Sequence, residues 1–132
     1  MLSHELEVLI KSEVPLIVIE STEENQVVDV LHDLKPLHAR PLFKWTLTEG
    51  IQRIDREMAP QKLFSSPTDA LQHIKSVSTP GIYVLADIHP FLDEPMHIRL
   101  LKDIALQFDQ LGHTMILLSH ALTVPVELRK LT

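Results

Sequence analysis

The alternation of short apolar runs with segments of helical periodicity is the feature that most limits how this chain can fold. Apolar runs of strand length lie at residues 15–20, 42–47, 81–86 and 114–118. Between them, and before the first, apolar residues recur every three to four positions, which is typical of helices with one buried face. Strands that alternate with helices predict βαβ units around a parallel sheet.

The apolar runs also predict where each strand lies in the sheet. The run at 15–20 is almost unbroken, as a parallel strand buried on both faces requires. The run at 42–47 alternates more, so we expect it nearer an edge. Residues 50–65 show no clear periodicity, and we expect a loop there with room for a short helix. The expected fold class is therefore α/β, with three αβα layers and a mostly parallel sheet of about four to five strands.

Local signals predict where the helices begin and end. Ser21 and Glu24 form a capping-box pair directly after the first strand, and Pro36 is expected to end that helix. Ser66 is followed by a proline at the first helical position, a favourable N-terminus. The longest helix opens near residue 95 and is expected to end at Gly112, which suits a left-handed C-terminal cap.

The length of 132 residues fits one domain, which we expect to span residues 1–132. The chain stops where a doubly wound sheet would continue to a further strand. We therefore expect it to be one domain of a longer protein.

Composition excludes several classes of function. With 12 Lys and Arg against 18 Asp and Glu, the net charge is −6, and no nucleic-acid partner is expected. The absence of cysteine excludes disulfides, Cys-ligated metal sites and thiol nucleophiles, and it suits a cytoplasmic location. No apolar run approaches the roughly 20 residues of a membrane helix, so no membrane segment is expected.

The carboxyl ends of the strands form the candidate functional rim, because open α/β sheets bind ligands there. The run ending at Asp87 has the form of a Walker B strand, whose terminal aspartate positions magnesium for phosphoryl transfer. A structural alternative is that Asp87 only caps the next turn. Phe91 either packs on the following helix or is presented to a partner. The candidate rim residues are Glu20, Ser21, Asp87, His89, Phe91 and Ser119.

A phosphate-binding turn is missing from the sequence. Such a turn needs glycines ending in Lys-Ser or Lys-Thr, whose backbone amides face the anion. The chain has three glycines, and none of them lies in the turn directly after the first strand. That junction instead carries Glu20, Glu23 and Glu24, which would repel a triphosphate. We therefore predict that this chain is not an enzyme and holds no cofactor.

Two other kinds of site are possible from the residues. Glu20, Asp87 and Ser119 mimic the acidic residues, acceptor and hydroxyl of a phosphoacceptor receiver domain, but the lysine that such a domain needs after a fifth strand is missing. A standalone receiver-like, phosphate-sensing or small-ligand domain is thus the alternative function. A composite metal site from Asp87, His89 and His120 is geometrically conceivable. No His-x-x-x-His pair exists, however, and we predict no metal site.

Five segments together resemble a known family. They are residues 6–24, with Leu-Ile-Val-Ile-Glu-Ser-Thr-Glu-Glu at the end, 43–50, 80–93, 115–119 and 124–128. The most specific segment is the Pro-Gly strand that runs into Asp-Ile-His-Pro-Phe-Leu. These segments look like the N-terminal region of the AAA-type ATPases of bacteria, cyanobacteria and plastid genomes, and the similarity spans nearly the whole chain.

The resemblance implies a degenerate AAA-like domain with a P-loop-like fold that lacks Walker A. In that family a downstream AAA module binds and hydrolyses ATP with magnesium. Asp87 would match the Walker B position, Ser119 the sensor position, and residues 124–129 the start of the next helix. The expected function is a non-catalytic interaction or regulatory domain, with the downstream AAA module or another protein as its partner.

Overall fold

A computed structural model describes residues 2–38, 40–54 and 63–120. In this part of the chain, five strands form one sheet in the order β1-β5-β4-β2-β3. Neighbouring strands are parallel except β2 and β3, which form an antiparallel hairpin. The strands are β1 (Leu16–Glu20), β2 (Leu42–Thr46), β3 (Gly50–Arg53), β4 (Ile82–Ala86) and β5 (Thr114–Ser119). The helices are α1 (Leu2–Lys11), α2 (Glu24–His38), α3 (Pro67–Ser76), the short 3-10 helix η1 (His89–Phe91), α4 (Pro95–Leu106) and α5 (Phe108–Leu111).

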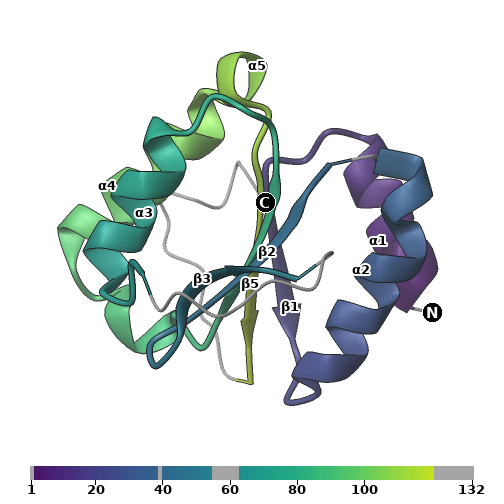
Figure 1. Cartoon of the computed structure of the whole chain (residues 1–132), viewed down its shortest axis with the longest axis horizontal. Helices are drawn as coiled ribbons and strands as arrows, with labels where there is room; N and C mark the ends of the chain where they lie inside the picture. Colours follow the sequence, from purple (N-terminus) through teal and green to yellow (C-terminus); the bar gives the residue numbers. More distant parts are fainter. Residues whose placement is uncertain (1, 39, 55–62, 121–132) are drawn as a thin grey trace.

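Helices cover both faces of the sheet, which makes three layers (Figure 1). Helices α1 and α2 lie on one face, and α3 and α4 lie on the other. Strand β5 is buried along its whole length and alternates between the two cores. Met115 and Leu117 pack in the α3/α4 core, whereas Ile116 and Leu118 pack in the α1/α2 core. Each such side chain contributes roughly 1.5–3 kcal/mol through burial, which explains the unbroken apolar sequence of this strand. The predicted α/β class and three layers are confirmed.

The outer positions of the sheet are taken by β1 and β3. The almost unbroken run at 15–20 forms β1, which packs in both cores as predicted although it lies at an edge. Strand β2 lies next to the other edge strand, between β4 and β3. Strand β2 alternates because its two faces have different neighbours. Phe43 and Trp45 pack in the α3/α4 core, whereas Lys44 lines an open groove beside α2.

The expected loop at 50–65 begins as a strand instead. Gly50 has φ +71° and ends the turn of the β2–β3 hairpin. A Cβ at Gly50 would lie 2.1 Å from the carbonyl oxygen of Leu63, so only glycine fits. Leu63 in turn accepts a hydrogen bond of 2.9 Å from the Ile51 amide. Residues 55–62, where a short helix was expected, lie outside the described part.

Several helix boundaries also differ from the prediction. The predicted cap at Ser66 is confirmed, since its hydroxyl accepts the Asp69 amide at 3.4 Å. Helix α2 continues to His38, two residues past Pro36, because a proline near a helix end removes one bond without ending the helix. The long helix is interrupted at Gln107, so α4 ends at Leu106 and the left-handed Gly112 caps α5. The segment 124–129 lies outside the described part.

The predicted capping box at the start of α2 is wrong. The Ser21 hydroxyl accepts a hydrogen bond from the Glu23 amide at 3.0 Å, which forms a tight local turn. The Glu24 carboxylate faces Lys44 of β2 instead of returning to the backbone of Ser21. Ion pairing across the layers thus replaces the local cap.

Candidate functional site: the carboxyl rim of the sheet

The structure brings the ends of β1, β5 and β4 together at one rim. Glu20 is paired in register with Ser119, and Ala86 with Leu118. The Ser21 amide donates to the Ser119 carbonyl at 2.9 Å, and the Asp87 amide donates to the Leu118 carbonyl at 2.8 Å. Four of the predicted rim residues, Glu20, Ser21, Asp87 and Ser119, therefore lie at adjacent strand ends.

Asp87 is exposed and has an unusual backbone conformation. Its φ of 57° places it in the left-handed region, which a residue with a side chain enters at a cost of about 1 kcal/mol. Within the described residues its carboxylate makes no hydrogen bond or ion pair. The alternative reading, that Asp87 caps the next turn, has no support, because η1 begins after Ile88 without a side-chain cap. The carboxylate is held at the rim by its backbone and stays open to solvent.

His89 joins the rim through Ser119. The Ser119 hydroxyl and His89 Nδ1 lie 2.6 Å apart, and the His120 ring meets the His89 ring edge-on at 5.1 Å between centroids. Ser119 is only 1% exposed, so its hydroxyl fixes the loop after β4 to the end of β5 and is shielded from solvent. This burial does not suit a nucleophile.

A small cleft of about 170 Å³ opens at this rim. This volume is below the roughly 300 Å³ at which clefts for drug-sized ligands begin. Its lining residues are Ser21, Thr22, Glu24, Asp87, Leu118 and His120. Two carboxylates in so small a space oppose the binding of a polyphosphate.

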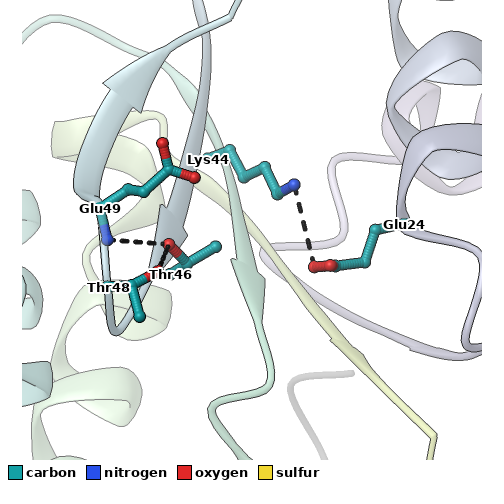
Figure 2. Close-up of polar contacts among 5 residues, drawn as sticks. All are labelled: Glu24, Lys44, Thr46, Thr48 and Glu49. Carbon is teal, nitrogen blue, oxygen red and sulfur yellow. Dashed lines mark hydrogen bonds and ion pairs between the residues drawn. The ribbon is translucent and has the colours of Figure 1, made fainter. Parts of the chain in front are cut away.

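The N-terminus of α2 is where a phosphate would sit in a nucleotide-binding domain, because helix N-termini attract anions. Here Glu24 begins that helix, and Figure 2 shows its carboxylate directed to Lys44. Glu24 Oε1 lies 3.8 Å from Lys44 Nζ and is buried without a hydrogen bond to any described residue. Next to Lys44, Thr46 accepts the Glu49 amide at 3.1 Å, which fixes the hairpin turn (Figure 2). The first residue of α2 thus places a negative charge of the chain itself near the position where an anion would bind.

Phe91 belongs to the framework of the rim. It is half-buried and meets Trp45 edge-on, with 6.3 Å between ring centroids. Its carbonyl accepts a hydrogen bond of 2.6 Å from His97 Nδ1, so His97 Nε2 accepts from the Thr68 hydroxyl at 2.7 Å. The packing interpretation of Phe91 is therefore favoured over presentation to a partner.

Two residues that the sequence analysis missed support this rim, His97 and Lys44. His97 is 4% exposed and lies on the apolar face of α4, one turn before Leu101. In the sequence, the available signal was a histidine at a position where helical periodicity predicts a buried apolar residue. Lys44 was the single charge within an apolar strand.

The described residues contain no group of three or more His, Asp or Glu side chains placed to hold a metal ion. Asp87, His89 and His120 are all described, and they do not form such a group. No described helix is long and apolar enough to cross a membrane.

Fold and rim together define a P-loop-like α/β domain in which acidic residues lie at the end of the first strand. A family model of the N-terminal domain of SpoVK-like AAA ATPases matches residues 2–132. The chain belongs to this family, which confirms the resemblance seen in the sequence.

Three curated relatives carry the description "Uncharacterized AAA domain-containing protein ycf46". The protein from Pyropia yezoensis is 25% identical over 129 residues, which cover 96% of this chain and 26% of the relative. The one from Guillardia theta is 25% identical over 127 residues, which cover 94% of this chain and 25% of the relative. The one from Trieres chinensis is 26% identical over 130 residues, covering 96% and 26%. The chain therefore spans about a quarter of the length of these relatives. No solved structure matches it.

Proposed function

We propose that this domain is a non-catalytic interaction or regulatory part of an AAA-family ATPase. The observation that carries the proposal is the N-terminus of α2, where Glu24 stands at the anion position and faces Lys44 at 3.8 Å. A phosphate bound there would lie close to the negative charges of Glu24, Glu20 and Glu23, which would repel it. ATP and magnesium, in this proposal, bind in a downstream AAA module.

The rim around Asp87 is the proposed contact surface for that module. Its carboxylate is exposed, is held in a left-handed conformation and has no partner among the described residues. Strained backbone at an exposed site is a feature of functional positions, and loops on rigid scaffolds carry contacts. His89 and Ser119 hold this loop against β5 at 2.6 Å. A standalone receiver-like function is not favoured, because the chain matches an N-terminal AAA-family domain over residues 2–132.

Lack of cysteine fits a reducing cytoplasm, where we expect the ATPase to act. Neither a nucleic acid nor a membrane is a proposed partner, given the net charge of −6.

The test compares the full-length ATPase with a variant that lacks residues 1–132. We expect ATP binding to persist without the domain, while the ATPase rate or its response to a partner changes severalfold. A matched pair then locates the surface: Asp87→Asn at the rim should alter that rate, and Lys11→Ala at the opposite end of the sheet should not. Loss of ATP binding on deletion, or equal effects of the two substitutions, would overturn the proposal.

A further inference from the structure

A hollow of about 450 Å³ lies at the amino end of the sheet, opposite the carboxyl rim. Four segments line it, and they precede β1, β2, β4 and β5, the four strands that run parallel to one another. Figure 1 shows α5 and the end of α1 together at this end of the sheet. Clefts that hold small ligands begin at roughly 300 Å³, so this hollow has the size of a ligand site, whereas the cleft at the rim is smaller.

Two left-handed turns fix the walls of the hollow. Glu13 has φ 59°, and its amide donates to the Ile10 carbonyl at 3.1 Å, which ends α1 in a turn that usually contains glycine. Across the hollow, Gly112 has φ 69° and ends α5. A Cβ at Gly112 would lie 2.9 Å from Pro80 Cγ, so the loop before β4 packs directly on this turn. The two turns hold side chains of distant segments around one space.

One side of the hollow is apolar. It consists of Ile10, which is buried, Phe108, which is half-buried, and the exposed Pro80. Helix α4 ends before Gln107, so Phe108 begins the separate helix α5 and lines the hollow. Within the described residues, the Phe108 ring meets no other aromatic ring. An apolar wall with an aromatic ring and few polar groups is typical of sites that bind small molecules.

The other side of the hollow carries a positioned cation. The half-buried Arg40 donates to the Gly112 carbonyl at 2.9 Å, which holds its guanidinium at the hollow. Burial lowers the pKa of Arg40, and the nearby charge of Glu13 opposes this effect without cancelling it. A further negative charge would therefore stabilise the guanidinium. Lys11 also lines the hollow, but it is exposed and paired with Glu7 at 3.1 Å, so we give it no role in binding.

We propose that this hollow binds a small organic carboxylate with an aromatic or branched aliphatic body. The body packs against Phe108, Ile10 and Pro80, and the carboxylate accepts hydrogen bonds from the Arg40 guanidinium, whose planar donors match a carboxylate. A phosphate monoester suits the hollow less well, because Glu13 repels its second negative charge. The proposal goes beyond the proposed function, since the hollow lies at the opposite end of the sheet from the rim.

Three matched probes test the proposal by nuclear magnetic resonance titration of the 132-residue chain. Phenylacetate, 2-phenylethanol and 2-phenylethylamine share a ring and differ in the charge of the end group. We expect phenylacetate to bind about tenfold more tightly than the other two, since it alone offers a carboxylate to Arg40. The amide signals of Ile10, Phe108 and Gly112 should shift, and that of Asp87 should not. Equal affinities, no saturation up to about 10 mM phenylacetate, or shifts centred on Asp87 would overturn the proposal.

A pair of alanine variants tests the apolar side. Phe108→Ala should weaken phenylacetate binding about tenfold, because the body of the probe loses the ring on which it packs. Leu106→Ala is the matched control, since Leu106 is 58% exposed near the end of the neighbouring helix and does not line the hollow. Its affinity should equal that of the wild-type chain. Equal losses in the two variants would contradict the proposal.

A change at Glu13 tests the charged side without removing a hydrogen bond of Arg40 to the loop before β5. Glu13→Gln removes the carboxylate that competes for the guanidinium, so phenylacetate should bind about threefold more tightly. Arg40→Met should abolish binding, with thermal unfolding showing that the variant is folded at the temperature of the titration. Weaker binding by Glu13→Gln, or retained binding by Arg40→Met, would overturn the proposal.

Discussion

The two ends of the sheet differ in whether all of their charged side chains have partners. At the amino end, Arg40 donates to the Gly112 carbonyl at 2.9 Å and to the Thr114 hydroxyl at 2.8 Å, and His113 Nε2 donates to the Val77 carbonyl at 2.7 Å. At the carboxyl end, Asp87 is exposed and has no side-chain partner among the described residues. Polar groups at the amino end hold loops together. At the carboxyl end Ser119 and His89 do the same, but the Asp87 carboxylate is left available for a contact.

Hollow space alone does not separate the two ends. A hollow of about 450 Å³ lies at the amino end, lined in part by Lys11, Glu13 and Arg40. Lys11 is paired with Glu7 at 3.1 Å, and Arg40 already bonds the loop before β5. The smaller cleft at the carboxyl end is lined by the Asp87 carboxylate, which has no partner among the described residues, and this is why we propose the contact surface there.

Replacing one histidine at each end of the sheet should give the largest difference in the free energy of unfolding between the two ends. His113 is 0% exposed and meets Tyr83 edge-on at 5.2 Å, so His113→Ala should lower the free energy of unfolding by about 3 kcal/mol through a cavity and a lost hydrogen bond. Replacing the half-buried His89 by alanine should lower the free energy of unfolding by about 1 kcal/mol or less. Urea denaturation monitored through Trp45 measures both. Equal losses would remove the distinction between the two ends.

Arg40 should show the next largest effect. Arg40→Met keeps much of the apolar stem but leaves the Gly112 carbonyl and the Thr114 hydroxyl without this donor, so we expect a loss of about 1–2 kcal/mol. The control is Lys11→Met, which breaks only an exposed ion pair and should cost less than about 0.5 kcal/mol. A smaller effect for Arg40 than for Lys11 in urea denaturation would contradict the structural role of the amino end.

The amino end should also make stability depend on pH. Burial lowers the pKa of His113 below its ordinary value of 6.5, and burial does the same to His73. Below pH 6.5 these histidines take up protons more readily in the unfolded chain than in the folded chain. Their contribution to the free energy of unfolding is therefore fully present above pH 6.5 and is lost as the pH is lowered. His113→Gln should flatten this part of the profile, measured by thermal unfolding between pH 5 and 8. A wild-type protein whose thermal stability increases toward low pH would contradict a buried neutral histidine.

Asp87 should give the smallest change in stability. Asp87→Asn keeps a side chain that tolerates the left-handed backbone, so the free energy of unfolding should stay within about 0.5 kcal/mol. Asp87→Gly removes the backbone strain and should be neutral or stabilising by up to about 1 kcal/mol. Thermal unfolding compares the two variants. A loss above 1 kcal/mol for Asn would show that the carboxylate has a structural partner.

The sequence predicted the order of the elements because each strand and helix has a local pattern. The alternating cores of β5 follow directly from its unbroken apolar run. Sheet order could not be predicted, since it depends on which strands meet after folding, and an apolar run such as residues 15–20 does not reveal that it lies at an edge. The hairpin at Gly50 was missed because its second strand has only four residues.

For the candidate site, the rim at Asp87 and Ser119 was predictable because parallel strands end on the same side of a sheet. The partners of the side chains could not be predicted, because they depend on how separate elements pack. The approach of Lys44 to Glu24 joins residues of different layers, and the contact between His97 and Phe91 depends on how the loop after β4 folds back. Neither contact follows a sequence spacing.

The most direct test of the central claim is calorimetric titration of the 132-residue chain with ATP and magnesium. Because Glu24 stands at the anion position of α2 and no glycine-rich turn follows β1, we expect no measurable heat of binding up to millimolar nucleotide. Saturable binding with a Kd in the micromolar range, lost in an Asp87→Asn variant, would contradict the claim and identify the rim as a working nucleotide site.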